Sequence, residues 1–92
     1  MISHTTDGFR KLYKKLPRLV QDQAREAYRL FKKSPDHPSL HFKRVHSRKP
    51  VYSVRINIDY RAVGILDDSE VVWFWLGSHS AYAKFLKQLR NS

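Results

Sequence analysis

The chain has 92 residues, of which 41% are hydrophobic and 13% aromatic, enough for one folded domain over residues 1–92 and too many for a disordered chain. It contains no cysteine, which excludes disulfides and thiolate zinc sites, and no apolar run approaches the roughly 20 residues of a membrane span, so we expect a cytoplasmic protein without a membrane partner. Eighteen Lys and Arg against eight Asp and Glu give a formal net charge of +10, which favours a polyanionic partner such as nucleic acid.

Two helices are predicted in the first third of the chain. Apolar side chains recur at helical spacing through residues 7–15, opposite lysines and arginines, which is the pattern of an amphipathic helix. Pro17 ends this helix and suits the first turn of a second helix over about residues 17–33. Ser34 and Pro35 end the second helix. We therefore expect an antiparallel helical hairpin.

Beyond the hairpin the hydrophobic pattern changes to strict alternation, which is typical of half-buried strands. The pattern predicts strands that begin at Leu40, Tyr52, Arg61 and Val71. The second runs to Ile58, and the last ends at Leu76 and is apolar on both parities, so it should be central and covered on both faces. Trp73 and Trp75 share a parity there, and we expect both in the core. A helix over residues 80–90 completes an α+β fold with an N-terminal helical hairpin, a four-stranded antiparallel sheet and a short C-terminal helix.

The positive charge is concentrated in the middle of the chain. No acidic residue lies between Asp36 and Asp59, whereas five lysines and arginines do. A solvated basic face and a phosphate-binding surface are both compatible with such a run. His41 and His46 lie in the same stretch, and we expect them to contact solvent or RNA rather than to act in catalysis.

His79 and Tyr82 directly follow the predicted core strand, where a rigid element would hold them in place. Histidine is the side chain that most readily exchanges a proton near neutral pH, and Tyr82 shares a helical face with His79 if the helix has begun. Each residue also has a structural interpretation, His79 as a surface or capping residue and Tyr82 as a core residue. The five histidines show no ligand spacing with carboxylates, so we expect no metal site.

Three segments resemble the RelE/ParE superfamily of bacterial type II toxins: SLHFKRV, the strand pair VYSVRINIDYRAVGIL and the ending VVWFWLGSHSAYAKFL. The likeness rests on their order and spacing and runs from Phe9 to Leu89. It implies a RelE-like fold and a toxin that a cognate antitoxin holds inactive. RelE-like members are endoribonucleases that cleave mRNA, usually in the ribosomal A site, whereas ParE-like members poison DNA gyrase. A basic nucleic-acid-binding module without chemistry is a further alternative.

The resemblance also implies a chemistry that uses no metal or other cofactor, in which the ribose 2′-OH attacks its neighbouring phosphate. Arg61 matches the arginine that family members place against the scissile phosphate, and Tyr82 matches a tyrosine early in the C-terminal helix. His79 falls near a position where RelE members often carry arginine. We therefore expect Arg61, His79 and Tyr82 to be catalytic. The expected substrate-binding residues are Arg55, Lys43, Arg44, Arg48 and Lys49.

Two positions leave alternatives open. Arg61 shares a parity with Val63, so it would point toward the core inside the sheet, but at the start of a strand it can reach the rim. Its structural alternative to a phosphate contact is an ion pair, for example with Asp59. Ser53 stands where the RelE/ParE resemblance implies that a lysine is common.

Overall fold

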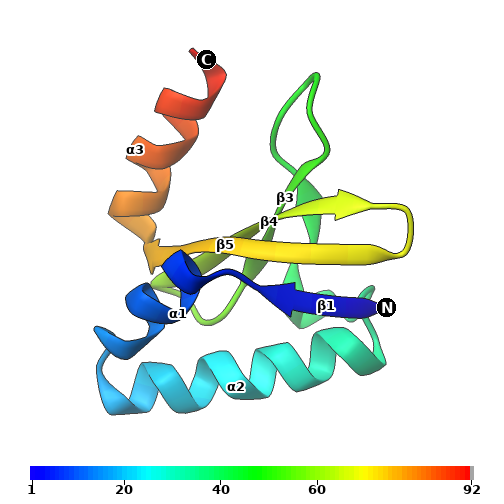
Figure 1. Cartoon of the computed structure of the whole chain (residues 1–92). Coiled ribbons are helices and arrows are strands. Elements are labelled where there is room, and N and C mark those ends of the chain that lie inside the picture. The colour runs from blue at the N-terminus through cyan, green and yellow to red at the C-terminus, as the bar shows by residue number, and fades with distance from the viewer. Residues whose placement is uncertain (92) are drawn as a thin grey trace.

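The computed structural model describes residues 1–91. Its elements, in chain order, are β1 (Ile2–Thr5), α1 (Asp7–Lys14), α2 (Arg18–Lys33), a 3₁₀ turn (Pro38–Leu40), β2 (Lys43–Arg44), β3 (Val51–Arg55), β4 (Tyr60–Asp67), β5 (Glu70–Ser78) and α3 (His79–Arg90). The strands form one mixed sheet in the order β1-β5-β4-β3-β2, in which β1 runs parallel to β5 and the other neighbours are antiparallel (Figure 1). Helices α1 and α2 pack on one face of the sheet and α3 packs on the other. No helix within residues 1–91 is long and apolar enough to cross a membrane.

The helical hairpin lies where the sequence predicts it. Helix α1 begins after Thr6, whose side-chain oxygen caps the helix by accepting a hydrogen bond from a first-turn amide at 3.1 Å. Gln21 closes the joint between the two helices, because its side-chain amide donates to the carbonyl of Tyr13 at 3.1 Å. Buried Phe31 anchors the far end of α2, with its ring centroid 5.1 Å from that of Trp73 in the sheet.

The sheet has a fifth strand that the sequence pattern does not predict. The segment that forms β1, ISHT, contains a single apolar residue and therefore has no strand period. Tertiary contacts hold it instead: the indole of Trp73 donates to Ser3 Oγ at 2.7 Å, and the amide of Ile2 donates to the carbonyl of Ser69 at 3.2 Å. The α+β class is confirmed, but the sheet is five-stranded and mixed rather than four-stranded and antiparallel.

Two of the predicted strands are shorter than expected because side chains fold their neighbours into turns. Leu40 is buried in the 3₁₀ turn, which His37 caps by accepting a hydrogen bond from the amide two residues on at 3.3 Å. Strand β2 consequently has only two residues. Strand β3 ends at Arg55 rather than at Ile58, since Asn57 Oδ1 accepts hydrogen bonds from the amides two and three residues on, at 2.8 and 2.9 Å.

Strand β5 lies between β1 and β4 with helices on both sides, which confirms the prediction of a central, covered strand. A β-bulge leaves one extra residue in it. Val63 of β4 faces Trp75, whereas the next residue of β4 faces Trp73. The two tryptophans therefore lie on opposite faces, so the prediction of a shared face is wrong. Trp73 joins the core beneath α1 and α2, and Trp75 stacks on Phe85 of α3 with centroids 4.8 Å apart.

Candidate nucleic-acid interface

Cross-strand pairing places three of the predicted basic residues on the sheet face that carries α3. Residues directly opposite one another in a sheet project to the same face. Val63 belongs to the core cluster beside α3, and its partner Ser53 pairs in turn with Lys43 of β2. Arg55 lies two residues after Ser53 in β3, and Arg61 lies two residues before Val63 in β4. The two arginines pair with each other and project to this face as well. We call Arg55 and Arg61 the arginine pair.

Arg61 supports the turn between β3 and β4. Its Nη1 donates to the carbonyl of Asn57 at 2.6 Å and to the carbonyl of Tyr60 at 3.0 Å. These bonds, rather than the alternative ion pair with Asp59, fix the guanidinium within the described part of the chain. They use Nη1 alone, so Nε and Nη2 have no hydrogen-bond acceptor among residues 1–91.

The arginine pair has an electrostatic consequence. Like charges that face each other across two strands destabilise a sheet. Arg55 forms no side-chain hydrogen bond or ion pair within residues 1–91, and Arg61 bonds only to carbonyls. An anion between the two guanidinium groups would relieve the repulsion and accept several charge-assisted hydrogen bonds.

Helix α3 begins beside the arginine pair. Its N-cap, Ser78, pairs with Tyr60 at the start of β4, and the amide of His79 donates to the carbonyl of Asp59 at 2.5 Å. The His79 side chain is exposed and forms no hydrogen bond with any described residue. Its ring centroid lies 6.1 Å from that of Tyr82. The imidazole is therefore held near the arginine pair by its backbone and is free to meet a ligand.

Tyr82 is largely a core residue. Its side chain is 6% exposed, and its ring centroid lies 6.4 Å from that of Trp75. Its hydroxyl donates to Ser53 Oγ at 3.0 Å, so the side chain joins α3 to β3. Of the three predicted catalytic residues, Tyr82 is the one whose polar atom is already engaged by a buried partner.

A groove of about 780 Å³ opens between α3 and the segment that begins at β2, and we call it the basic groove. Its lining residues are Lys43, Arg44, Val45, His46, Ser47, Arg48, Tyr82, Leu86 and Arg90. None of these lining residues, all within the described chain, is acidic. The structure thus brings Lys43, Arg44 and Arg48 together around Tyr82, whereas Lys49 is exposed beside the groove and does not line it.

Arg90 and His46 also line the basic groove. The sequence pattern does not identify Arg90 as a substrate-binding residue, and it predicts that His46 contacts solvent or RNA. Arg90 follows Tyr82 and Leu86 at steps of four along α3, so helical spacing from Tyr82 could have identified it. His46 is 8% exposed, and both its ring and its carbonyl bond to the chain around it. Of the two alternatives for His46, solvent contact is therefore wrong, and contact with RNA stays a prediction.

The predicted site residues form two neighbouring regions. One holds the arginine pair and His79 at the start of α3, and the other is the basic groove. Tyr82 connects them, because its ring lines the groove and stacks obliquely beside His79. Within residues 1–91 no three His, Cys, Asp or Glu side chains are grouped to hold a metal ion.

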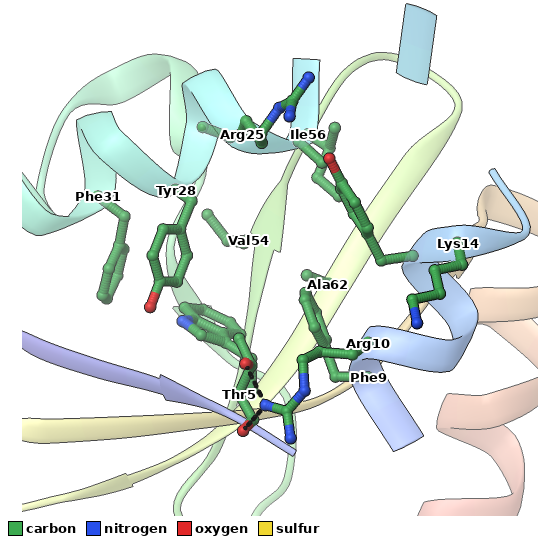
Figure 2. A pocket seen from close by; sticks show the side chains of 14 residues that line it. Thr5, Phe9, Arg10, Lys14, Arg25, Tyr28, Phe31, Val54, Ile56 and Ala62 are labelled. Atoms are coloured by element: carbon green, nitrogen blue, oxygen red, sulfur yellow. Dashed lines mark hydrogen bonds between the residues drawn. The ribbon is translucent and has the colours of Figure 1, made fainter. Parts of the chain in front are cut away.

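A second cavity, of about 470 Å³, lies on the opposite face between α1, α2 and the sheet (Figure 2), and we call it the apolar groove. Its walls are mostly aromatic and aliphatic, with Arg10, Lys14 and Arg25 among them. Arg10 donates to the carbonyl and the hydroxyl of Thr5 at 2.7 and 2.9 Å, as the dashed lines in Figure 2 show. A hydrogen bond to Asp22 raises the pKa of Arg25. The groove therefore combines apolar walls with three basic side chains.

A helical hairpin on one face of a β-sheet and a C-terminal helix on the other, with basic residues along that second face, define a RelE-like toxin fold. Residues 18–84 match the ParE-like toxin domain, and the chain belongs to this family. This confirms the resemblance to the RelE/ParE superfamily. No curated protein sequence matches the chain.

Solved structures share the fold over nearly the whole chain. The RelB-RelE antitoxin-toxin complex from Methanococcus jannaschii has a TM-score of 0.73 at 12% identity, covering 89% of this chain and 96% of that chain. YafQ from Escherichia coli has a TM-score of 0.66 at 14% identity, covering 87% and 94%. A copper-bound mutant toxin from Helicobacter pylori has a TM-score of 0.58 at 24% identity, covering 88% and 97%.

Proposed function

We propose that this chain is the toxin of a type II toxin-antitoxin system and that it stops translation as a metal-independent mRNA endoribonuclease. The observation that carries the proposal is the arginine pair beside the exposed imidazole of His79. Guanidinium groups can stabilise the charge that develops during RNA transesterification, and an imidazole can carry out one of its two proton transfers. The adjoining basic groove, about 780 Å³ in volume, offers a path for the rest of the strand.

The reaction forms a bond between the ribose O2′ and phosphorus and breaks the bond between phosphorus and O5′. Its products are a 2′,3′-cyclic phosphate and a 5′-OH. The arginine pair stabilises the charge that develops on the pentacoordinate phosphorus, with Nε and Nη2 of Arg61 as uncommitted donors. His79 carries out one of the two proton transfers, either accepting the proton of the 2′-OH or donating a proton to O5′, and solvent water carries out the other. Tyr82 supports the nucleotide with its ring, since its hydroxyl is bonded to Ser53.

Pulse labelling after induction tests the proposal against its main alternative. The family name, ParE-like toxin domain, favours a DNA gyrase inhibitor as the second candidate. A ribonuclease should stop incorporation of labelled methionine first, whereas a gyrase inhibitor should stop incorporation of labelled thymidine first. Thymidine arrest that precedes translation arrest would refute the ribonuclease proposal. Growth without arrest of either kind would leave a nucleic-acid-binding module.

We also propose that the RNA is cleaved on the ribosome. A small domain with a formal net charge of +10 is attracted to ribosomal RNA as well as to mRNA. The purified protein, incubated with one mRNA in the presence and in the absence of ribosomes, provides the test. Cleavage at the same rate in both reactions would refute ribosome dependence and leave the endoribonuclease proposal intact.

The partner that we propose is a cognate antitoxin with an acidic or amphipathic segment. Such a segment would either cover the arginine pair or displace α3, because both carry the charge that RNA would meet. The apolar groove offers a second surface for an apolar helix flanked by acidic residues (Figure 2). Lys14 forms no ion pair within residues 1–91, whereas Arg10 and Arg25 are paired with the exposed carboxylates of Asp7 and Asp22.

Co-expression with the neighbouring open reading frame tests the partner. Rescue of growth is the expected result, and failure of every neighbouring frame to rescue would contradict it. Ala27→Arg places a long cation in the apolar groove and should weaken rescue. Leu19→Arg is the matched control, because Leu19 lies on the same helix, is 68% exposed and does not line the groove. Equal rescue of both variants would show that the antitoxin does not use the apolar groove.

A further inference from the structure

We propose that His46 is a positioning residue that orders the basic groove for the phosphate groups of single-stranded RNA. This inference rests on the proposed function of the groove as an RNA path. His46 does not itself need to touch RNA. It acts by holding the backbone of Arg48 and Lys49 and, through its carbonyl, the side chain of Arg44.

Three hydrogen bonds carry the inference. Nδ1 of His46 accepts from the amides of Arg48 and Lys49, each at 3.0 Å. The carbonyl of His46 accepts from Nε of Arg44 at 2.9 Å. Three of the five predicted substrate-binding residues therefore bond to one buried histidine. Because Nδ1 receives two N–H groups, the ring proton lies on Nε2.

The segment that His46 holds has little else to order it. Ser47, Arg48, Lys49 and Pro50 are all exposed. Consecutive like charges repel one another and extend a loop. The other backbone bonds hold the two ends of the loop. The amide of Val51 donates to the carbonyl of Lys49 at 2.8 Å, the amide of Leu66 to the carbonyl of Pro50 at 2.9 Å, and the amide of Val45 to the carbonyl of Val51 at 2.8 Å. Without an acceptor at His46, the groove wall would lose its defined position.

The chain contains a precedent for the same arrangement. Oδ1 of Asn57 accepts from the amides two and three residues on, at 2.8 and 2.9 Å, and so holds the turn between β3 and β4. Nδ1 of His46 makes the same pair of bonds with the same spacing. An asparagine side chain can therefore place an acceptor where Nδ1 of His46 lies. Phenylalanine keeps a buried aromatic ring of similar size but has no acceptor.

The ordered loop should raise the affinity for RNA, because it loses less conformational entropy when RNA binds. Side chains that already face the groove bind phosphate without first being ordered. The loss of this order should weaken binding about tenfold, the equilibrium factor for fixing roughly one backbone residue. The positive charge of the loop is unchanged, so the effect separates position from charge.

The experiment uses a fluorescent single-stranded 2′-O-methyl oligoribonucleotide, which lacks the attacking hydroxyl and cannot be cleaved. Its dissociation constant is measured by anisotropy with the wild-type protein, His46→Phe and His46→Asn. His46→Phe should bind about tenfold more weakly, and His46→Asn should stay within about threefold of wild type. Amide hydrogen exchange at Arg48 and Lys49 should be faster in His46→Phe and slow again in His46→Asn.

Equal binding by wild type and His46→Phe would overturn the inference, and so would equal losses in both variants. Denaturant unfolding of each variant shows that it is folded, and His46→Leu replaces His46→Phe if the phenylalanine ring does not fit. A wild-type protein that does not bind the probe would also overturn the inference. If the probe binds and the variants behave as expected, but unmodified mRNA is cleaved neither with nor without ribosomes, the proposed enzymatic function is wrong and the role of His46 is retained.

Discussion

The hydrogen bond between Tyr82 and Ser53 offers a direct test of what the tyrosine does. Tyr82→Phe removes the hydroxyl but keeps the ring that lines the basic groove. If Tyr82 supports the nucleotide with its ring, the variant should cleave RNA within a few-fold of wild type. If the phenol transfers a proton, cleavage should fall by about 100-fold to 10,000-fold.

The same substitution should cost stability, because Ser53 is 1% exposed and its buried hydroxyl would lose the partner that Tyr82 provides. A buried polar group left without a partner costs about 1–3 kcal/mol. In a domain of this size each kcal/mol lowers the melting temperature by about 4–8 °C. The double variant Tyr82→Phe with Ser53→Ala removes both polar groups and should recover most of the loss.

Urea unfolding, monitored by tryptophan fluorescence, measures the stability of the wild type, Tyr82→Phe, Ser53→Ala and the double variant. Cleavage of one mRNA in a translation extract measures their activity. The expected result is a clear loss of stability with nearly full activity in Tyr82→Phe. If Tyr82→Phe is as stable as wild type but its cleavage activity falls more than about 100-fold, this reasoning is refuted and the Tyr82 hydroxyl takes part in proton transfer.

Three further predictions concern other residues. Arg61→Ala should reduce cleavage about 100-fold to 1,000-fold and also lower the unfolding midpoint, because it loses both carbonyl bonds. His79→Ala should reduce cleavage about 100-fold to 10,000-fold at unchanged stability. Full toxicity of both variants would place the site elsewhere. Gly64→Ala should destabilise the fold by about 1–3 kcal/mol in urea unfolding, since its Cβ would lie 2.8 Å from the Trp73 ring and 2.9 Å from a backbone carbonyl; wild-type stability would contradict this packing argument. Lys49→Ala should weaken binding of the 2′-O-methyl probe only slightly and make its salt slope shallower by about 0.7, and an unchanged slope would show that Lys49 contacts no phosphate.

The helices and the central strand could be predicted because their cause is local. An apolar stripe at helical spacing, broken by Pro17, is sufficient for a helical hairpin. Strand β1 could not be predicted, since its order comes from a partner strand about seventy residues away and from the bond between Trp73 and Ser3. The bulge in β5 could not be predicted either, because the residues on both faces of this strand are apolar. A run that is apolar on both parities gives no signal when its faces exchange.

The candidate site shows the same division between local and tertiary causes. The concentration of charge between Asp36 and Asp59 predicted the basic wall of the groove, and the position of Tyr82 after a core strand predicted its closeness to His79. The carbonyl bonds of Arg61 and the buried ring of His46 depend on turn geometry. Histidine is not a typical turn-capping residue, so the sequence carried no signal for its role.

The parallel strand at the N-terminus also bears on how the chain avoids aggregation. Val71 to Leu76 is a continuous apolar segment rich in aromatic and β-branched residues, the type of sequence that pairs readily with other chains when its edge is open. β1 covers the first half of that edge with a short and mostly polar strand, and α1 then packs against β5. Because the pairing joins residues 2–5 to residues 70–73, the edge can be closed only after β5 has been synthesised. Until then the open edge of β5 can pair with other chains. Because β1 must find a strand that is distant in the sequence, rapid folding is as important for avoiding aggregation as the stability of the final fold.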